Sequence, residues 1–401
     1  MNKGTSRLGI ALGILCGVGP MATDMYLGAM PDIAASLNGS AASVQLSVMA
    51  FFLGFTVGQL FYGPISDRTG RKPMIYLALA IFVVSSVGCM VAGDVWQLLG
   101  WRLLQGAGGS IGMVMAAAVI RDLYTGAKAA RLMSVVVLVN GVAPIVAPLI
   151  GSLLLGFGSW RLIFLSLVIL GLIAAILAWF LLPETRMDEL RQVSKPHHAF
   201  KWYRHLLARR DFIPYAGTLA LAQGGFFVYI AGSSFIFIDL YGLTPLAYSL
   251  LFSFNAIGLA IGAQVATRQV PRFGLRAVAR VSTAISGIAA VLLLAIQLAG
   301  AGGIVPTSVP LFVMVSSLGG IMPTRNGLSP EGHGAISGVA AALMGALGFG
   351  AGAATSFLLG LFENGTATPM ILIIAACAVA AAVTSHAAFP RGNEPVEAAH
   401  A

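Results

Sequence analysis

The sequence consists of long apolar runs separated by short polar segments. A helix that crosses a bilayer needs about 20 apolar residues, and twelve runs meet that length. The apolar positions within each run are continuous instead of alternating, so transmembrane β-strands are excluded. The predicted fold class is an all-α membrane protein with twelve transmembrane helices, at residues 8–31, 43–65, 73–93, 96–119, 131–156, 160–182, 212–238, 246–267, 277–299, 304–323, 334–361 and 367–389.

The composition agrees with this pattern. Hydrophobic residues make up 58% of the 401 residues and charged residues only 9%, whereas soluble domains contain about 25% charged residues. Lys3 and Arg7 precede the first run, as in a signal peptide. The run continues beyond the length of a signal-peptide core, so we expect it to stay as the first span.

The distribution of positive charge explains the net charge of +9. In the predicted topology, Arg102 lies within a span and Arg161 lies in a loop on one side of the membrane, and the other lysines and arginines all lie on the opposite side. The positive-inside rule therefore predicts that both termini are cytoplasmic. Basic loops of this kind set topology and touch anionic lipids, and no basic patch with interleaved aromatics indicates nucleic-acid binding.

The chain divides into two halves of six spans at its longest polar stretch. "DRTGRK" after span two is echoed by "PRFGLR" after span eight, and small residues at Ala143, Ala147 and Gly151 recur as Ala346, Gly350 and Ala354. Two similar six-helix bundles are typical of secondary transporters, although small-residue ridges also serve simple packing. The expected units are an N-terminal bundle with the proton site, a basic cytoplasmic connector, a C-terminal bundle and a disordered tail, at residues 1–182, 183–211, 212–390 and 391–401.

Two charged residues lie well inside predicted spans: Asp24 in span one and Arg102 in span four. A rise of 1.5 Å per residue puts both about 11 Å below the outer surface. We expect them to face each other across the cavity of the first half, because an unpaired charge there costs several kcal/mol. They form either a permanent ion pair that fixes helix packing or a site that takes and releases a proton.

Several segments resemble the major facilitator superfamily, and in particular its twelve-span drug:proton antiporters of the bicyclomycin and chloramphenicol resistance branch. "GPISDRTGRKP" resembles the signature loop between spans two and three, and "LLGWRLLQGAGG" resembles the span-four motif whose arginine, here Arg102, is implicated in proton transfer. "DMYLGAMP" resembles the span-one motif, with Gly28 where the family usually has proline.

The resemblance also implies roles for further residues. Asp67 would interact with the start of span eleven and Arg71 with Asp122, which would latch the cytoplasmic side. The expected latch residues are Gly63, Asp67, Arg68, Gly70, Arg71, Lys72 and Asp122. "APIVAPLIGS" resembles the span-five antiporter motif, carried here by Ala143, Pro144, Ala147, Pro148 and Gly151.

A drug cavity with apolar walls and few polar groups is expected between the halves. Each aromatic candidate serves equally well as a lipid or packing contact, while an amide in span five is costly to bury without a partner. The candidate substrate-binding residues are Asp24, Phe51, Asn140, Phe226, Tyr229 and Phe235.

Other classes of protein fit the sequence less well. "GGSIG" matches the serine-hydrolase pattern, but no strand precedes it, so no enzyme is expected. His197, His198 and His205 have no acidic or cysteine cluster beside them, which argues against a metal site. No P-loop occurs, and protons are the expected coupling ion, with no other cofactor.

The sequence therefore predicts a monomeric drug:proton antiporter in the bacterial inner membrane. It would export lipophilic antibiotics such as phenicols or bicyclomycin-like compounds, with lipids and protons as its other partners. The alternative is a proton-coupled transporter of a nutrient such as an amino acid or a sugar, which would need more polar cavity residues.

Overall fold

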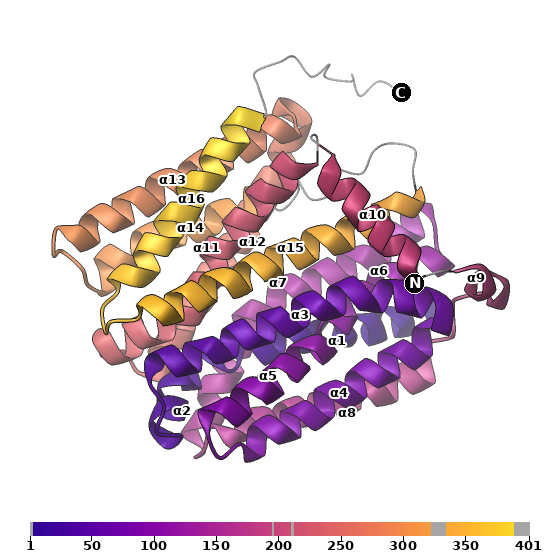
Figure 1. Cartoon of the computed structure of the whole chain (residues 1–401), viewed down its shortest axis with the longest axis horizontal. Helices are drawn as coiled ribbons and strands as arrows, with labels where there is room; N and C mark the ends of the chain where they lie inside the picture. Colours follow the sequence, from indigo (N-terminus) through magenta and orange to yellow (C-terminus); the bar gives the residue numbers. More distant parts are fainter. Residues whose placement is uncertain (1–2, 195, 210–211, 322–333, 389–401) are drawn as a thin grey trace.

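The computed structural model describes residues 3–194, 196–209, 212–321 and 334–388. All regular elements within these residues are helices, and twelve spans are long and apolar enough to cross a membrane. The predicted fold class is thus confirmed. Figure 1 shows the helices of the first half, in indigo to magenta, packed beside those of the second half, in rose to yellow. The predicted disordered tail, 391–401, lies outside the described residues.

Four of the first six spans are single helices, and two are interrupted. The elements are α1 (Lys3–Asp24), the 3₁₀ turn η1 (Leu27–Ala29), α2 (Met30–Ser36), α3 (Ala41–Thr69), α4 (Arg71–Val91), α5 (Val95–Gly109), α6 (Ile111–Leu123), α7 (Gly126–Gly156) and α8 (Arg161–Leu181). Span one consists of α1, η1 and α2, and span four consists of α5 and α6.

The connector contains two short helices, and the second six spans are mostly single helices. The connector carries α9 (Asp188–Val193) and α10 (Pro196–Ala208), and the spans are α11 (Ile213–Ser234) with the π-helix η2 (Phe235–Leu240), α12 (Pro245–Phe273), α13 (Leu275–Leu298), α14 (Ile304–Ile321), α15 (Gly334–Phe362) and α16 (Thr368–Ala388). Span seven thus ends in a π-helix, a form often found at functional sites.

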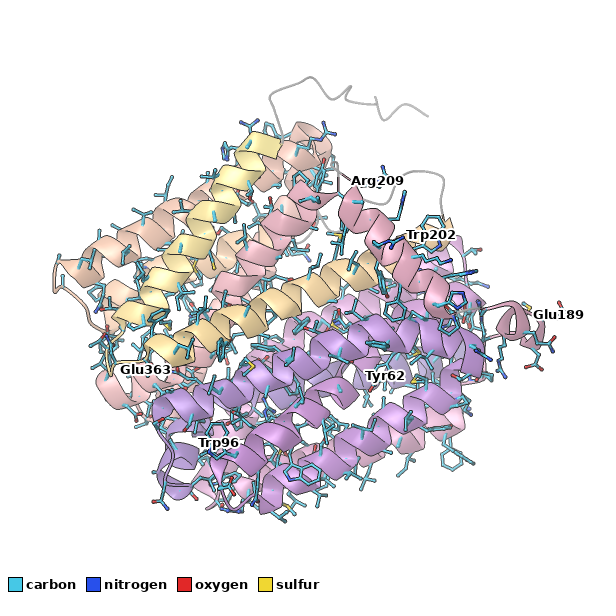
Figure 2. The ribbon with its side chains drawn as sticks, in the orientation of Figure 1. Tyr62, Trp96, Glu189, Trp202, Arg209 and Glu363 are labelled. Atoms are coloured by element: carbon cyan, nitrogen blue, oxygen red, sulfur yellow. The ribbon has the colours of Figure 1, made fainter. Side chains whose placement is uncertain are left out.

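The two ends of the bundle differ in charge. We call one the basic end, where α3 meets α4 at Arg68, Arg71 and Lys72, and the other the acidic end, which carries Asp94 and Glu363. Figure 2 shows Trp96 and Glu363 near the acidic end and Trp202 and Glu189 near the basic end.

The break in the first span has a local cause. Pro31 has no N–H to bond the Leu27 carbonyl, and its ring would clash there in a continuous helix. Gly28 adds a residue with weak helical preference. The chain therefore leaves α1 after Asp24, makes one 3₁₀ turn closed by the Ala29 N–H on the Tyr26 carbonyl at 3.1 Å, and restarts as α2.

The break in the fourth span lies at Ser110, inside the "GGSIG" segment. A methyl group at Gly112 would collide with the backbone carbonyl of Leu15 in α1, and one at Gly106 would collide with the Phe51 carbonyl in α3. Only glycine permits these close approaches. The serine of this segment, Ser110, is buried in a helix junction and donates to the Ala107 carbonyl at 2.9 Å.

The halves touch along α3 with α15 and along α7 with α12. At the acidic end, Gln45 Nε2 of α3 donates to Glu363 Oε2, after α15, at 3.2 Å. Midway, Ser253 Oγ of α12 donates to the Ile145 carbonyl of α7 at 2.7 Å. At the basic end, the Arg121 guanidinium lies against Gly338 of α15. The two halves are therefore in contact at both ends and between them.

Candidate transport site

Asp24 is the last residue of α1 and stands at the break of the first span. Its side chain is nearly buried, with 5% of the residue exposed. Among the described residues it forms no hydrogen bond and no ion pair. Interrupted spans with polar groups at the break are typical of substrate and ion sites in transporters.

Two tyrosines of the second half interact electrostatically with Asp24. They are Tyr229 of α11 and Tyr248 of α12, both buried. Tyr229 accepts a hydrogen bond from Asn255 Nδ2 at 2.8 Å, and the Tyr248 hydroxyl lies 2.8 Å from Ser233 Oγ. The carboxylate of one half therefore interacts electrostatically with two hydrogen-bonded tyrosine hydroxyls of the other half.

Two buried acceptors near this set have no partner among the described residues: Asn255 Oδ1 and Ser249 Oγ. Ser249 lies against Gly28, within ordinary contact of a methyl group placed there. The Tyr229 ring stacks on Phe252 with centroids 5.5 Å apart and planes 7° from parallel. The site thus combines flat aromatic surface with unfilled hydrogen-bonding capacity.

Arg102 does not pair with Asp24, so the expected ion pair is absent from this structure. Its Nη1 donates to the Ala22 carbonyl at 2.9 Å and to Gln105 Oε1 at 2.6 Å. The contact with Ala22 brings the Arg102 guanidinium to the last turn of α1, which ends at Asp24. Their directions differ, because Asp24 faces the second half at the break while Arg102 points into the first half.

Arg102 is held in an aromatic cage inside the first half. The guanidinium carbon lies 4.5 Å from the Tyr26 ring centroid and 4.3 Å from that of Phe51. Cation–π contacts of this kind strengthen when water is excluded. Gln105 extends the network by donating to Ser86 Oγ at 2.8 Å. Arg102 Nε and Nη2 are buried without a hydrogen-bond partner in the described part of the chain.

The other predicted substrate-binding residues lie in several places. Tyr229 belongs to the site beside Asp24, whereas Phe51 is fully buried in the cage of Arg102. Phe226 borders a void inside the second half, between α11, α13, α14 and α16. Phe235 is buried in the π-helix, and Asn140 Nδ2 donates back to its own helix, to the Val136 carbonyl at 3.0 Å.

An aromatic cluster that the sequence analysis did not identify joins the halves. We call it the interface cluster: Phe52 and Phe55 of α3, Phe227 of α11 and Phe349 of α15. The centroids of Phe52 and Phe227 are 4.3 Å apart, and those of Phe55 and Phe349 are 4.2 Å apart. Phe227 also packs on Phe349, with their ring centroids 4.9 Å apart, so the cluster connects α3, α11 and α15. The sequence signal for this cluster is the presence of phenylalanines near the middle of spans in both halves, but the sequence does not show that they meet.

The span-five motif supports the break in span one. Ala143, Ala147 and Gly151 are buried on one face of α7, with Pro144 and Pro148 inside the helix. A methyl group at Gly151 would collide with the carbonyl of Met25, the residue after Asp24. The corresponding ridge of span eleven is incomplete, since Ala346 is buried but Ala354 is exposed.

The predicted pair between Arg71 and Asp122 is confirmed at the basic end. Arg71 Nε lies 2.9 Å from Asp122 Oδ2, and its Nη2 lies 2.9 Å from Asp67 Oδ1. Arg71 Nη1 also donates to Ser66 Oγ at 2.6 Å. Arg68 is exposed on the same loop. The predicted contact of Asp67 with the start of span eleven is untested, because residues 322–333 lie outside the described residues.

The loop is further fixed at Gly70, Lys72 and Gly63. Gly70 has φ of 101°, which glycine adopts without strain, and it precedes the first residue of α4. Lys72 Nζ donates to the Trp179 carbonyl at 3.3 Å. Gly63 leaves room for Val114 of α6 at ordinary contact distance. The motif residues thus bind α3, α4, α6 and α8 of the first half to each other.

Glu184, from the "LPET" segment, caps α4. Its carboxylate accepts the backbone N–H groups of Arg71 at 2.9 Å and Lys72 at 3.0 Å, as anions do at a helix N-terminus. Partial burial opposes ionisation, but the backbone donors of Arg186, Arg71 and Lys72 and the charge of Arg191 hold the pKa of Glu184 below its ordinary value.

Twelve apolar spans arranged in two helical bundles define the chain as a multi-pass membrane protein. Residues 12–356 match the model of the Major Facilitator Superfamily, so the chain belongs to that family. The chain is therefore a transporter and not an enzyme.

Relatives and solved structures agree with this assignment. The chain is 34% identical to the uncharacterized MFS-type transporter YdgK of Bacillus subtilis, over 94% of each chain. It is 28% identical to the bicyclomycin resistance protein homolog of Haemophilus influenzae, over 94% of this chain and 95% of that one. A crystal structure of a D-xylose-proton symporter shares the fold, with a TM-score of 0.76 and 18% identity over 96% of this chain and 98% of that chain.

Proposed function

We propose that the protein is a drug:proton antiporter that exports lipophilic antibiotics by alternating access. The observation that carries this proposal is the Asp24 carboxylate, which is buried at the break of the first span and has no cationic partner among the described residues. A buried carboxylate without a counter-ion is costly when charged. The Asp24 carboxylate therefore favours either a bound proton or a ligand that replaces water. The drug and the proton compete for this carboxylate.

The second half supplies the drug contacts. Tyr229 and Phe252 offer stacked aromatic surface, and Asn255 Oδ1 and Ser249 Oγ offer unfilled acceptors. Walls of this kind suit a lipophilic molecule that carries a few hydroxyl or amide donors. Bicyclomycin-like compounds and phenicols are such molecules, and the name of the Haemophilus influenzae relative supports the first of these classes.

The cycle follows from contacts at the two ends. Opening the basic end would separate Arg121 from Gly338, and opening the acidic end would break the bond from Gln45 to Glu363. We place the basic end in the cytoplasm of a bacterial cell, with both termini there, on the positive-inside rule. Protonation of Asp24 from outside favours drug release, and proton loss to the cytoplasm restores drug affinity.

The coupling has a calculable strength. For a neutral drug exchanged for one proton, a membrane potential of 100 mV supplies about 2.3 kcal/mol. That energy supports a drug gradient of about 40-fold, since 1.4 kcal/mol corresponds to a factor of ten. Asp24→Asn keeps the size of the side chain but removes its charge, so this variant should equilibrate the drug without building a gradient.

The test is drug-induced proton release from purified protein in detergent, lightly buffered near neutral pH. Phenicols and bicyclomycin are added to wild type, to Asp24→Asn and to Asp32→Asn. Asp32 is an exposed carboxylate in α2 of the same span, so its variant controls for charge removal. We expect release from wild type and from Asp32→Asn, and none from Asp24→Asn.

Equal release from all three proteins would refute the assignment of the proton to Asp24. If no drug released protons while sugars or amino acids caused proton uptake, the nutrient transporter would replace the drug exporter.

A further inference from the structure

The connector helix α10 has three distinct faces. Tyr203 and Leu206 are buried against the bundle. The opposite face carries the exposed side chains of Lys201, Arg204 and His205. Exposed apolar side chains lie between these two faces, with Trp202 42% exposed. A helix with a basic face and flanking aromatics is typical of segments that lie in a membrane interface.

The helix crosses the seam between the two halves. Figure 1 shows α10 running across the basic ends of α3 and α15 at a steep angle to both, and it packs against both helices. The Tyr203 hydroxyl donates to the Leu60 carbonyl of α3 at 3.1 Å. This bond holds Tyr203 of α10 about two and a half turns before the end of α3 at Thr69.

The side of α3 beside α10 faces lipid. Leu53, Val57 and Phe61 recur every four residues and are 44%, 44% and 41% exposed, so they form one apolar stripe on the outside of the bundle. Phe200 of α10 meets the last of these rings, with the centroids of Phe200 and Phe61 5.2 Å apart. The apolar flank of α10 therefore continues the apolar outer stripe of α3 toward the basic end.

The charges of α10 match an anionic partner at this level. Lys201 and Arg204 form no ion pair with a described residue. Long basic side chains at the boundary of the hydrocarbon extend toward phosphates. Figure 2 shows Trp202 on the outer side of α10, where an indole is favoured at headgroup depth.

We propose that α10 is a binding surface for anionic phospholipid headgroups. Trp202 and Phe200 lie among the upper acyl chains, and Lys201 and Arg204 bind the phosphates of lipids such as phosphatidylglycerol. Because α10 packs on α3 and α15 together, a lipid held there contacts the seam at which the two halves meet. The inference is independent of the drug and of the proton.

The experiment uses the full chain in nanodiscs of phosphatidylcholine with a minor fraction of brominated lipid. The brominated lipid is either phosphatidylglycerol or phosphatidylcholine, and the fluorescence quenched at Trp202 is the difference between wild type and Trp202→Phe. We expect brominated phosphatidylglycerol to quench Trp202 more strongly at equal fraction, because it is enriched beside α10.

Two double variants separate a site from a general charge effect. Lys201→Gln with Arg204→Gln should lower the preference for phosphatidylglycerol by between about five-fold and 25-fold, because each basic side chain near the surface contributes about five-fold. Arg268→Gln with Arg272→Gln removes the same charge from exposed positions of α12 at the same end and should keep the preference.

Native mass spectrometry of the same proteins provides a second reading, as the number of phosphatidylglycerol molecules retained. Trp202 quenched equally by both lipids, or not quenched at all, would overturn the proposal. An equal loss of preference in the two double variants would overturn it as well, since the effect would then belong to the net charge of the basic end.

Discussion

Arg71 provides a sharp test of how the basic end is held together. The side chain is 5% exposed and binds two carboxylates, Asp122 and Asp67, which are 15% and 40% exposed. All these groups belong to the first half, so their bonds do not depend on how the two halves are arranged. We change the residue to glutamine, which keeps part of its volume and removes its charge.

The structure sets the size of the effect. The pair with the more exposed Asp67 joins the end of α3 to the start of α4 and contributes about 0.5 kcal/mol. Removing the charge beside Asp122 leaves a mostly buried carboxylate whose remaining donor is the Thr185 hydroxyl at 3.0 Å. A stranded buried charge of this kind costs about 3 kcal/mol. The total is about 3 kcal/mol in the free energy of unfolding.

The assay is thermal unfolding of the purified full chain in mild detergent. For a domain the size of one six-helix half, each kcal/mol of lost stability lowers the melting temperature by about 2–4 °C. Arg71→Gln should therefore melt roughly 6–12 °C below wild type. Arg68→Gln is the matched control, because Arg68 is exposed on the same loop and forms no ion pair with a described residue. An equal, small shift in both variants would refute the reasoning.

Two further changes test the cap of α4 and the support of the broken span. The pKa of Glu184 is depressed in the folded protein, so its ionised form contributes stability that is fully present above the ordinary value of about 4.3 and is lost as pH falls through the lower folded pKa. The melting temperature of Glu184→Gln should therefore lie below that of wild type at pH 7 and approach it below about pH 4; parallel curves would contradict the assigned cap. Gly151→Leu forces a side chain against the Met25 carbonyl and should cost about 1–3 kcal/mol of stability and most of the transport. Gly141→Ala in the same helix, where a methyl group meets nothing within 4 Å, should leave both unchanged, and normal transport by Gly151→Leu would show that this contact does not position Asp24.

Much of this fold can be predicted from the sequence, because a bilayer permits few kinds of membrane-spanning structure. The apolar run lengths predict twelve helical spans, since each backbone polar group must be bonded within its own helix. The sequence also places Asp24 and Arg102 at one depth, because depth depends only on the rise per residue. The pair between Arg71 and Asp122 was found through the resemblance to a family, since nothing in the local pattern brings a loop residue to the end of span four.

The tertiary structure decided which way these residues face. The rotation of a side chain about its helix axis depends on where the helix is interrupted and on which neighbours it packs against. The first span breaks after Asp24, which turns the carboxylate to the second half, and α5 packs so that Arg102 lies between Tyr26 and Phe51.

Contacts between the two bundles also depend on how the helices pack, so the sequence alone does not predict them. Asn255 meets Tyr229, and the four phenylalanines of the interface cluster meet each other, only because two bundles far apart in sequence come into register. The sequence by itself determined the number of spans, their depth and the positions of the charges. Contacts between spans required the three-dimensional structure, because a membrane fixes how deep a residue lies and leaves its direction to the packing of helices.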